Sequence, residues 1–378
     1  MELVLLLSLF LTSYVSSEND IRSGNNRFAI DLYNNLVTGH KNEAFSPFSL
    51  HTALSLTYEG SVNETEALFK DKLYLPSKTK TADKYKDLLT KVTRTQNVTF
   101  NVANKVLAKT GYNFVSTFED IATRNFLAET GSINFEDGDA AANEINSWVN
   151  KATNGKWDVE FKAERTRTEP FYVDETETVD VPMMHQTGDF YYGTSSELDA
   201  SLLKLRFRDP RFSLIIVLPN SKTGINRLEE GLKRVDVNDL LSNFGGAEVE
   251  VSLPRFKIES EHKLKDALTK LGLGDIFDGD KAKFPDIIKD VKSLEVKEVI
   301  HKVTIEINEE GGEAAAASGV IISIPLSSAY VPPPPIVFKA DHPFIFLLTA
   351  GTERDFREDY RNSVTLILGK VVTPENVS

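Results

Sequence analysis

Histidine and cysteine are the residue types that most often carry metal or nucleophilic chemistry, so they come first. The chain has no cysteine, which excludes a thiol nucleophile, a disulfide framework and a thiolate metal site. Its histidines show no metal-ligand spacing: His40, His51, His185, His262, His301 and His342. The sequence therefore predicts no metal site and no cofactor.

Motifs of hydrolases and nucleotide-binding enzymes are also missing. Neither G-x-S-x-G, G-x-G-x-x-G nor G-x-x-x-x-G-K occurs. Neighbouring acids, such as Glu309 with Glu310 or Asp137 with Asp139, are better explained as solvated loop charges than as an acid/base pair. We expect that this protein is not an enzyme.

The composition is that of a folded, acidic protein. Of 378 residues, 41% are hydrophobic and 10% aromatic, which is enough for a large core. The formal net charge of −13 disfavours binding to nucleic acid and to anionic membranes, so we expect neither as a partner.

The N-terminus predicts export. Residues 1–17 read MELVLLLSLFLTSYVSS, an apolar run too short to span a bilayer, followed by small residues that suit cleavage after about Ser17. Asn63 and Asn97 begin N-x-[ST] sequons, as does Asn376 near the C-terminus. We therefore expect a secreted, extracellular glycoprotein whose mature chain is a single domain over 18–378.

Hydrophobic periodicity places helices mostly early and strands mostly late. Helical spacing occurs at 25–37, 45–60, 64–76, 115–127, 141–153 and 262–273. Strand-like alternation or apolar runs occur at 100–111, 178–193, 202–207, 212–219, 247–260, 295–310, 340–351 and 363–374. No repeat, long linker or change in composition divides the chain, so we expect one mixed α+β domain.

One uncharged segment stands apart. Residues 309–335 read EEGGEAAAASGVIISIPLSSAYVPPPP, with no charge from Ala314 to Ile336. The alanines by themselves also suit the first turns of a helix. The β-branched residues that follow favour a strand, and Pro325 and the prolines at 332–335 exclude a helix and a central strand. These features predict a long loop that can become a strand.

The chain resembles the serpin family in six segments, in the right order. They are NEAFSPFSLHTALSLTYEGSVNET, VPMM, LPRFKIES, EVIHKVTIEINEEGGEAAAASG, HPFIFLL and GKVVTP. The resemblance implies a mixed α/β (α+β) fold with three β-sheets, about eight or nine helices and an exposed reactive loop near 309–342. It also implies a monomeric suicide inhibitor, whose loop is cleaved by a protease and inserts into sheet A, the sheet to which the strand at 295–310 belongs.

The resemblance assigns roles residue by residue. It implies an ion pair between Glu309 and Arg255 at the base of the loop. It places four small residues in the inserting strand. At Gly312 the chain departs from the Thr or Ser usual in the family, so we expect insertion to be slower or less stable but not lost. The hinge is Glu309, Glu310, Gly311, Gly312, Glu313, Ala314, Ala315, Ala316 and Ala317. The positions where the sheet parts are Arg255, Trp157, Ser46, Ser49 and His301.

The resemblance places the bond offered to the protease at Leu326-Ser327, with Pro325 and Tyr330-Val331 as rivals. No Lys or Arg occurs in this part of the loop, which disfavours a trypsin-like target. A chymotrypsin- or elastase-like serine protease, or a papain-like cysteine protease, fits better. The alternative is a non-inhibitory member that acts as a carrier, storage protein or decoy.

The chain departs from the family pattern after Lys156. Trp157 follows at once, where the family has a long apolar strand. The resemblance therefore implies that a stretch of about 20 to 25 residues is missing. Each neighbouring backbone group left without a hydrogen-bond partner would destabilise the fold by about 1–3 kcal/mol. The loss would also remove the Asn expected beside His301. A defective isoform is therefore a further alternative. If TRTEPFYVDE at 166–175 filled the place, no strand would be lost, but that stretch is charged.

Overall fold

The structure is a computed structural model of the chain, and it describes most of the sequence. The described residues are 20–37, 39–93, 98–99, 104–133, 154–241, 244–312, 334–351 and 363–375. Several predictions lie outside them, namely those for residues 1–17, Asn97, the helix at 141–153, and the hinge and cleavage residues Glu313, Ala314, Ala315, Ala316, Ala317, Pro325, Leu326, Ser327 and Tyr330.

A nine-stranded sheet forms the largest element. Its path runs β1-β16-β15-β9-β8-β7-β10-β14, and β6 pairs with β7. The strands are β1 (Glu43–Phe45), β6 (Arg167–Tyr172), β7 (Thr178–Ser195), β8 (Ala200–Arg206), β9 (Phe212–Pro219), β10 (Gly245–Pro254), β14 (Ile336–Lys339), β15 (Phe344–Ala350) and β16 (Val364–Val371). The apolar runs of β9, β15 and β16 are buried at every position, which explains why both of their faces are apolar.

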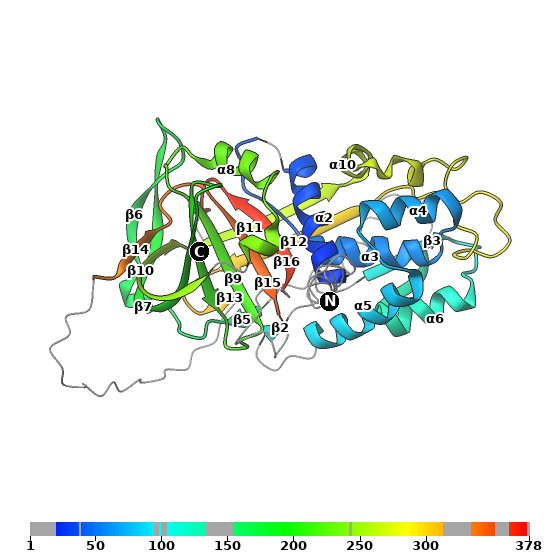
Figure 1. Cartoon of the computed structure of the whole chain (residues 1–378), viewed down its shortest axis with the longest axis horizontal. Helices are drawn as coiled ribbons and strands as arrows, with labels where there is room; N and C mark the ends of the chain where they lie inside the picture. The colour runs from blue at the N-terminus through cyan, green and yellow to red at the C-terminus, as the bar shows by residue number, and fades with distance from the viewer. Residues whose placement is uncertain are drawn as a thin grey trace, which may run out of the picture.

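Eight α-helices occur within the described ranges: α2 (Ile21–Leu36), α3 (Pro47–Glu59), α4 (Asn63–Lys72), α5 (Lys78–Thr93), α6 (Ser116–Asn125), α8 (Ile225–Leu232), α9 (Val237–Leu240) and α10 (Lys265–Leu268). In Figure 1, α3 to α6 lie at one end of the molecule and β6, β7, β10 and β14 at the other. Ser46 caps α3, because its Oγ accepts a hydrogen bond from the Ser49 N–H at 3.1 Å. The periodicity analysis missed α5, α8 and α9.

Shorter helical turns complete the helical elements. Residues Ala163–Arg165 and Gly274–Phe277 are 3₁₀ turns, and Thr269–Leu273 is a π turn. The predicted helix at 262–273 is therefore only partly regular. Its predicted end at Gly272 is confirmed, since this residue has a φ of 95°, which favours glycine.

Three small sheets make up the remaining strands. β11 (Phe256–Lys263) pairs with β12 (Ile300–Ile307), and β3 (Asn104–Lys109) pairs in parallel with β4 (Ala128–Ile133). The third sheet has the order β13-β5-β2, with β13 (Gly311–Gly312), β5 (Asn154–Lys156) and β2 (Val98–Thr99). The strand predicted at 295–310 is thus shorter than expected, since β12 begins only at Ile300.

These small sheets bear on the expectation that a strand is missing after Lys156. Among the described residues, β12 pairs along its length only with β11, and β3 pairs only with β4. The chain between the helix expected at 141–153 and Trp157 contributes only the three-residue β5. The alternative in which 166–175 fills the place is wrong, because Arg167–Tyr172 is β6 and pairs with β7 in the nine-stranded sheet.

Close packing in the core gives a first prediction. Gly369 on β16 lies opposite Phe346 on β15, and a Cβ at residue 369 would lie 2.5 Å from Phe346 Cζ and 2.7 Å from the Glu43 carbonyl oxygen. We expect Gly369→Ala to lower the free energy of unfolding by about 1–3 kcal/mol, because the ring and backbone must both shift.

Urea unfolding would measure this change. The matched control is Gly188→Ala on β7 of the same sheet, where the nearest neighbour of a new Cβ is 3.7 Å away. An equal loss in both variants would contradict the packing argument.

Candidate functional site

A tight turn lies at the base of the proposed reactive loop. The Asn308 N–H donates to the Gly311 carbonyl at 2.9 Å, and the Gly311 N–H donates back to the Asn308 carbonyl at 3.3 Å. Asn308 Oδ1 also accepts from the N–H groups of Glu310 at 3.0 Å and Gly311 at 3.2 Å. This side chain therefore fixes the point where the chain leaves β12 and reverses.

Beyond the turn the chain forms a strand. Gly311 lies opposite Lys156 and Gly312 lies opposite Gly155, in an antiparallel pair between β13 and β5. Gly311 has a φ of 130°, and a Cβ there would lie 2.0 Å from the Gly155 carbonyl oxygen. Only glycine fits this position, because any side chain would push the two strands apart.

An ion pair closes the base of the loop. Glu309 Oε1 accepts hydrogen bonds from Arg255 Nε at 2.8 Å and from an Arg255 guanidinium NH₂ at 2.5 Å, and Thr166 also donates to it. Burial alone would raise the pKa of Glu309, but the hydrogen bonds from Arg255 and Thr166 outweigh it and hold the pKa below its usual value. The carboxylate therefore stays charged, and it ties residue 309 to the junction between β10 and β11.

Residues 157–161, which follow β5, hold the same turn from the other side. The Trp157 indole Nε1–H donates to the Asn308 carbonyl at 2.9 Å, and the Trp157 backbone N–H donates to the Glu310 carbonyl at 2.8 Å. The Phe161 N–H donates to the Glu309 carbonyl at 2.9 Å. Residues 157–161 thus supply a hydrogen-bond donor to each of the three successive carbonyls of Asn308, Glu309 and Glu310.

A second cluster joins Ser46, Ser49 and His301. The Ser46 N–H donates to His301 Nε2 at 2.8 Å, and Ser46 Oγ donates to the Leu366 carbonyl at 2.7 Å. Burial, and then the charge of nearby His262, lower the pKa of His301 to about 3. His301 is therefore neutral, and the Ser46 backbone N–H is its hydrogen-bond donor.

The structure brings together Arg255, Trp157, Glu309, Glu310, Gly311 and Gly312 in one site, and Ser46, Ser49 and His301 in another. Sequence reasoning missed Thr166, Phe161 and Asn308. Only Asn308 had a local signal, since Asn before E-E-G favours a turn stabilised by its own side chain. Thr166 and Phe161 act through contacts more than 140 positions away in the chain, and no local pattern reveals these.

Three other predictions concern a glycosylation site, metal binding and membrane spans. Asn63 is exposed at the first residue of α4. No cluster of three or more potential metal ligands occurs in the parts of the chain that the structure describes. A search of those same parts finds no helix both long and apolar enough to span a membrane.

The Glu309–Arg255 pair gives a second prediction. We expect a double-mutant cycle with Glu309→Gln and Arg255→Met to show a coupling of about 1–2 kcal/mol in urea unfolding, since Glu309 is nearly buried and accepts two bonds from Arg255. The matched control is the exposed pair of Lys91 and Asp87, with Lys91→Met and Asp87→Asn. Exposed pairs contribute little, so we expect less than about 0.5 kcal/mol there; equal couplings would contradict the assignment.

The buried histidine gives a third prediction. Because the pKa of His301 is about 3 in the folded chain and near 6.5 in the unfolded chain, the unfolded chain binds a proton that the folded chain does not. His301 therefore stabilises the fold fully above pH 6.5, and this contribution falls by about 1.4 kcal/mol per pH unit as the pH drops toward 3. We expect His301→Gln to flatten the dependence of unfolding free energy on pH between 6.5 and 4; parallel curves would refute this.

Curated relatives match most of the chain. Antichymotrypsin-2 of Bombyx mori is 33% identical over 364 residues, covering 87% of this chain and 95% of the relative. Leukocyte elastase inhibitor A of Rattus norvegicus is 28% identical over 391 residues, covering 94% and 99%. That alignment is longer than the 378-residue chain, so the relative has residues without a counterpart here.

A solved structure and a family model agree with these relatives. Serpin48 of Tenebrio molitor superposes with a TM-score of 0.80 at 30% identity, covering 94% of this chain and 98% of that one. The family model described as serpin (serine protease inhibitor) matches residues 23–156 and 154–374. The two matches overlap at residues 154–156, where the sequence analysis predicts that a strand of the family is missing. The chain belongs to the serpin family.

Proposed function

We propose that this protein is a secreted protease inhibitor, not an enzyme, that acts as a suicide substrate. The observation that carries the proposal is the pairing of Gly311 and Gly312 with β5, directly after the turn tied by Arg255 and Glu309. Two residues near the start of the loop, Gly311 and Gly312, thus already lie as a strand at the point from which insertion would continue. The four alanines that follow add little steric resistance to such a strand.

The far end of the loop is anchored to another sheet. β14 pairs in parallel with β10, from Ile336 opposite Val249 to Lys339 opposite Ser252. Lys339 Nζ also forms an ion pair with Glu169 at 2.8 Å. Residues 313–333 therefore connect two fixed ends, and after cleavage the C-terminal part would stay on β10 while the N-terminal part is free to move.

The chemistry of the loop suggests the class of target. Leu326 at the proposed Leu326-Ser327 bond, or Tyr330 as its rival, suits the apolar specificity pocket of a chymotrypsin- or elastase-like protease, and a papain-like cysteine protease is a further target. The names of relatives do not choose the target, since antichymotrypsin-2, leukocyte elastase inhibitor A and an antitrypsin of Bombyx mori are all similar to this chain. We propose that the protein meets its protease as a monomer.

A second candidate function follows from the sheets. Within the described part of the chain, β12 has no second partner strand along Ile300–Ile307, so the sheet that should receive the loop is incomplete. A serpin whose sheet cannot hold the inserted strand would be cleaved without trapping the protease. That protein would be a non-inhibitory carrier, storage protein or decoy, or a defective isoform.

Incubation with chymotrypsin, pancreatic elastase and a cathepsin L-like protease tests the choice. An inhibitor is expected to form an SDS-stable complex with a serine protease, and mass spectrometry of the released C-terminal peptide identifies the cleaved bond. Ala316→Asp should convert the inhibitor into a substrate, because a charge in the inserting strand would be buried. The matched control Pro334→Asp, beyond all proposed bonds, should still form the complex.

Thermal unfolding of the cleaved chain separates the two candidates. Insertion adds a strand and should raise the melting temperature after cleavage. Clean cleavage with no complex and no gain in melting temperature would reject the inhibitor and favour the non-inhibitory candidate.

Secretion is proposed from the predicted signal and the sequons. In a eukaryotic secretory host, we expect the mature chain to begin near residue 18 and to lose mass on treatment with an N-glycosidase. Asn63 is exposed, so Asn63→Gln should remove one glycan from the secreted protein. Retention in the cell with an intact N-terminus would contradict the proposal.

A further inference from the structure

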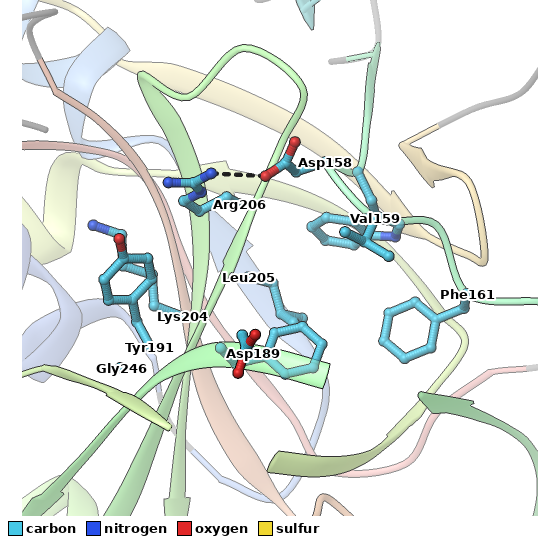
Figure 2. Close-up of a pocket in the computed structure, with 11 residues that line it drawn as sticks. Asp158, Val159, Phe161, Asp189, Tyr191, Lys204, Leu205, Arg206 and Gly246 are labelled. Atoms are coloured by element: carbon cyan, nitrogen blue, oxygen red, sulfur yellow. Dashed lines mark hydrogen bonds and ion pairs between the residues drawn. The ribbon is translucent and has the colours of Figure 1, made fainter. Parts of the chain in front are cut away.

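A cavity lies beside the base of the loop. It has a volume of about 310 Å³ and lies between residues 157–161 and strands β7, β8 and β10. Four aromatic residues contribute to its lining, namely Trp157, Phe161, Phe190 and Tyr191. Figure 2 shows that Phe161 and Tyr191 lie on opposite sides of it. A cavity of this volume is at the lower end of the range for small-molecule sites.

Contacts within the protein hold one wall of the cavity in place. The Asp158 N–H donates to the Arg206 carbonyl at 2.9 Å, which ties the wall to the end of β8. The Trp157 ring stacks on Phe207 with the ring centroids 4.5 Å apart. It also meets the Phe161 ring edge to face, with the centroids 6.5 Å apart. Both arrangements are attractive for aromatic pairs, so a ligand would meet rings that are already fixed.

The charged groups of the lining are already paired or solvated. Asp158 Oδ2 lies 2.7 Å from the Arg206 guanidinium (Figure 2), which also lies over the Tyr191 ring, 5.8 Å from its centre. Lys204 is 7% exposed and has an interaction of its own within the protein. Asp189 is exposed, so water solvates its charge. An ionic ligand would therefore lose hydration without meeting an unpaired charge among these residues.

We propose that this cavity binds a small neutral aromatic molecule, whose ring packs against Trp157, Phe161 and Phe190. The ring gains apolar and stacking contacts with these side chains. Val159 and Asp189 line the cavity and are exposed, so it is open to solvent and a ligand can enter. Binding here does not depend on the inhibitory function proposed above, so the two are tested separately.

Isothermal titration calorimetry of the full chain tests the proposal with three probes that share one ring system. We expect saturable one-to-one binding of the neutral 2-naphthylmethanol. The anion 2-naphthoate and the cation 2-naphthylmethylammonium should bind at least about tenfold more weakly, because each must lose hydration without gaining a partner. Absence of 2-naphthylmethanol binding, or an equal or higher affinity for either ion, would overturn the proposal.

A pair of neighbouring glycines supplies a blocking variant and its control. A Cβ built at either Gly246 or Gly245 has no atom within 4 Å, so both positions accept a side chain. Gly246 lines the cavity and lies opposite Tyr191, another lining residue, whereas Gly245 lies opposite Tyr192 and faces the other side of the strand. We expect Gly246→Leu to weaken 2-naphthylmethanol binding about tenfold and Gly245→Leu to leave it unchanged. Equal effects of the two variants, with folding checked by urea unfolding, would contradict the site.

An NMR titration shows where the ligand binds. The chain has two tryptophans, Trp148 and Trp157, so a proton–nitrogen correlation spectrum should contain two indole N–H signals, and Trp148→Phe identifies the signal of Trp157. A naphthalene ring packed against the Trp157 indole would shift this signal through its ring current. We expect the shift to saturate over the same ligand concentrations as the calorimetric titration. A Trp157 signal that does not move while 2-naphthylmethanol binds would place the ligand elsewhere and overturn the proposal.

Discussion

The close approach of Gly311 to Gly155 is the constraint on which the rest of the site depends. There is no room for a side chain between the two backbones, and glycine has none. The chain can therefore leave β12, reverse at Asn308 and pair with β5 in one short turn. Buried backbone groups must find partners, and here the partners come from residues 155–161. The ion pair of Arg255 with Glu309 then holds the turn against the end of β10.

The departure from the family pattern after Lys156 bears on what this turn has to do. Directly before Trp157 the described chain supplies only Asn154–Lys156, which pairs with both β2 and β13. Among the described residues, β12, which precedes the turn, pairs along its length with one strand, β11. Adding a strand along its other edge would gain backbone hydrogen bonds, which is the physical basis of loop insertion. The same open edge is the reason that a non-inhibitory function remains a candidate.

Trp157 connects two parts of the molecule that the sequence does not relate. Its indole and its backbone hold the turn at 308–310, and its ring stacks on Phe207, just after β8, with the ring centroids 4.5 Å apart. The base of the loop is therefore packed against the end of β8 through this one side chain.

The sequence by itself determined the elements whose signal is local. The apolar runs predicted β9, β15 and β16, the Ser46-Pro47 start predicted α3, and six short motifs indicated the family. Tertiary structure decided the rest. Examples are the hydrogen bond from Thr166 to Glu309, the hydrogen bond from the Ser46 N–H to His301, and the burial of Lys204 near aromatic residues. Periodicity reports which face of one element is apolar, whereas these contacts depend on which elements pack together, and that is fixed only by the fold.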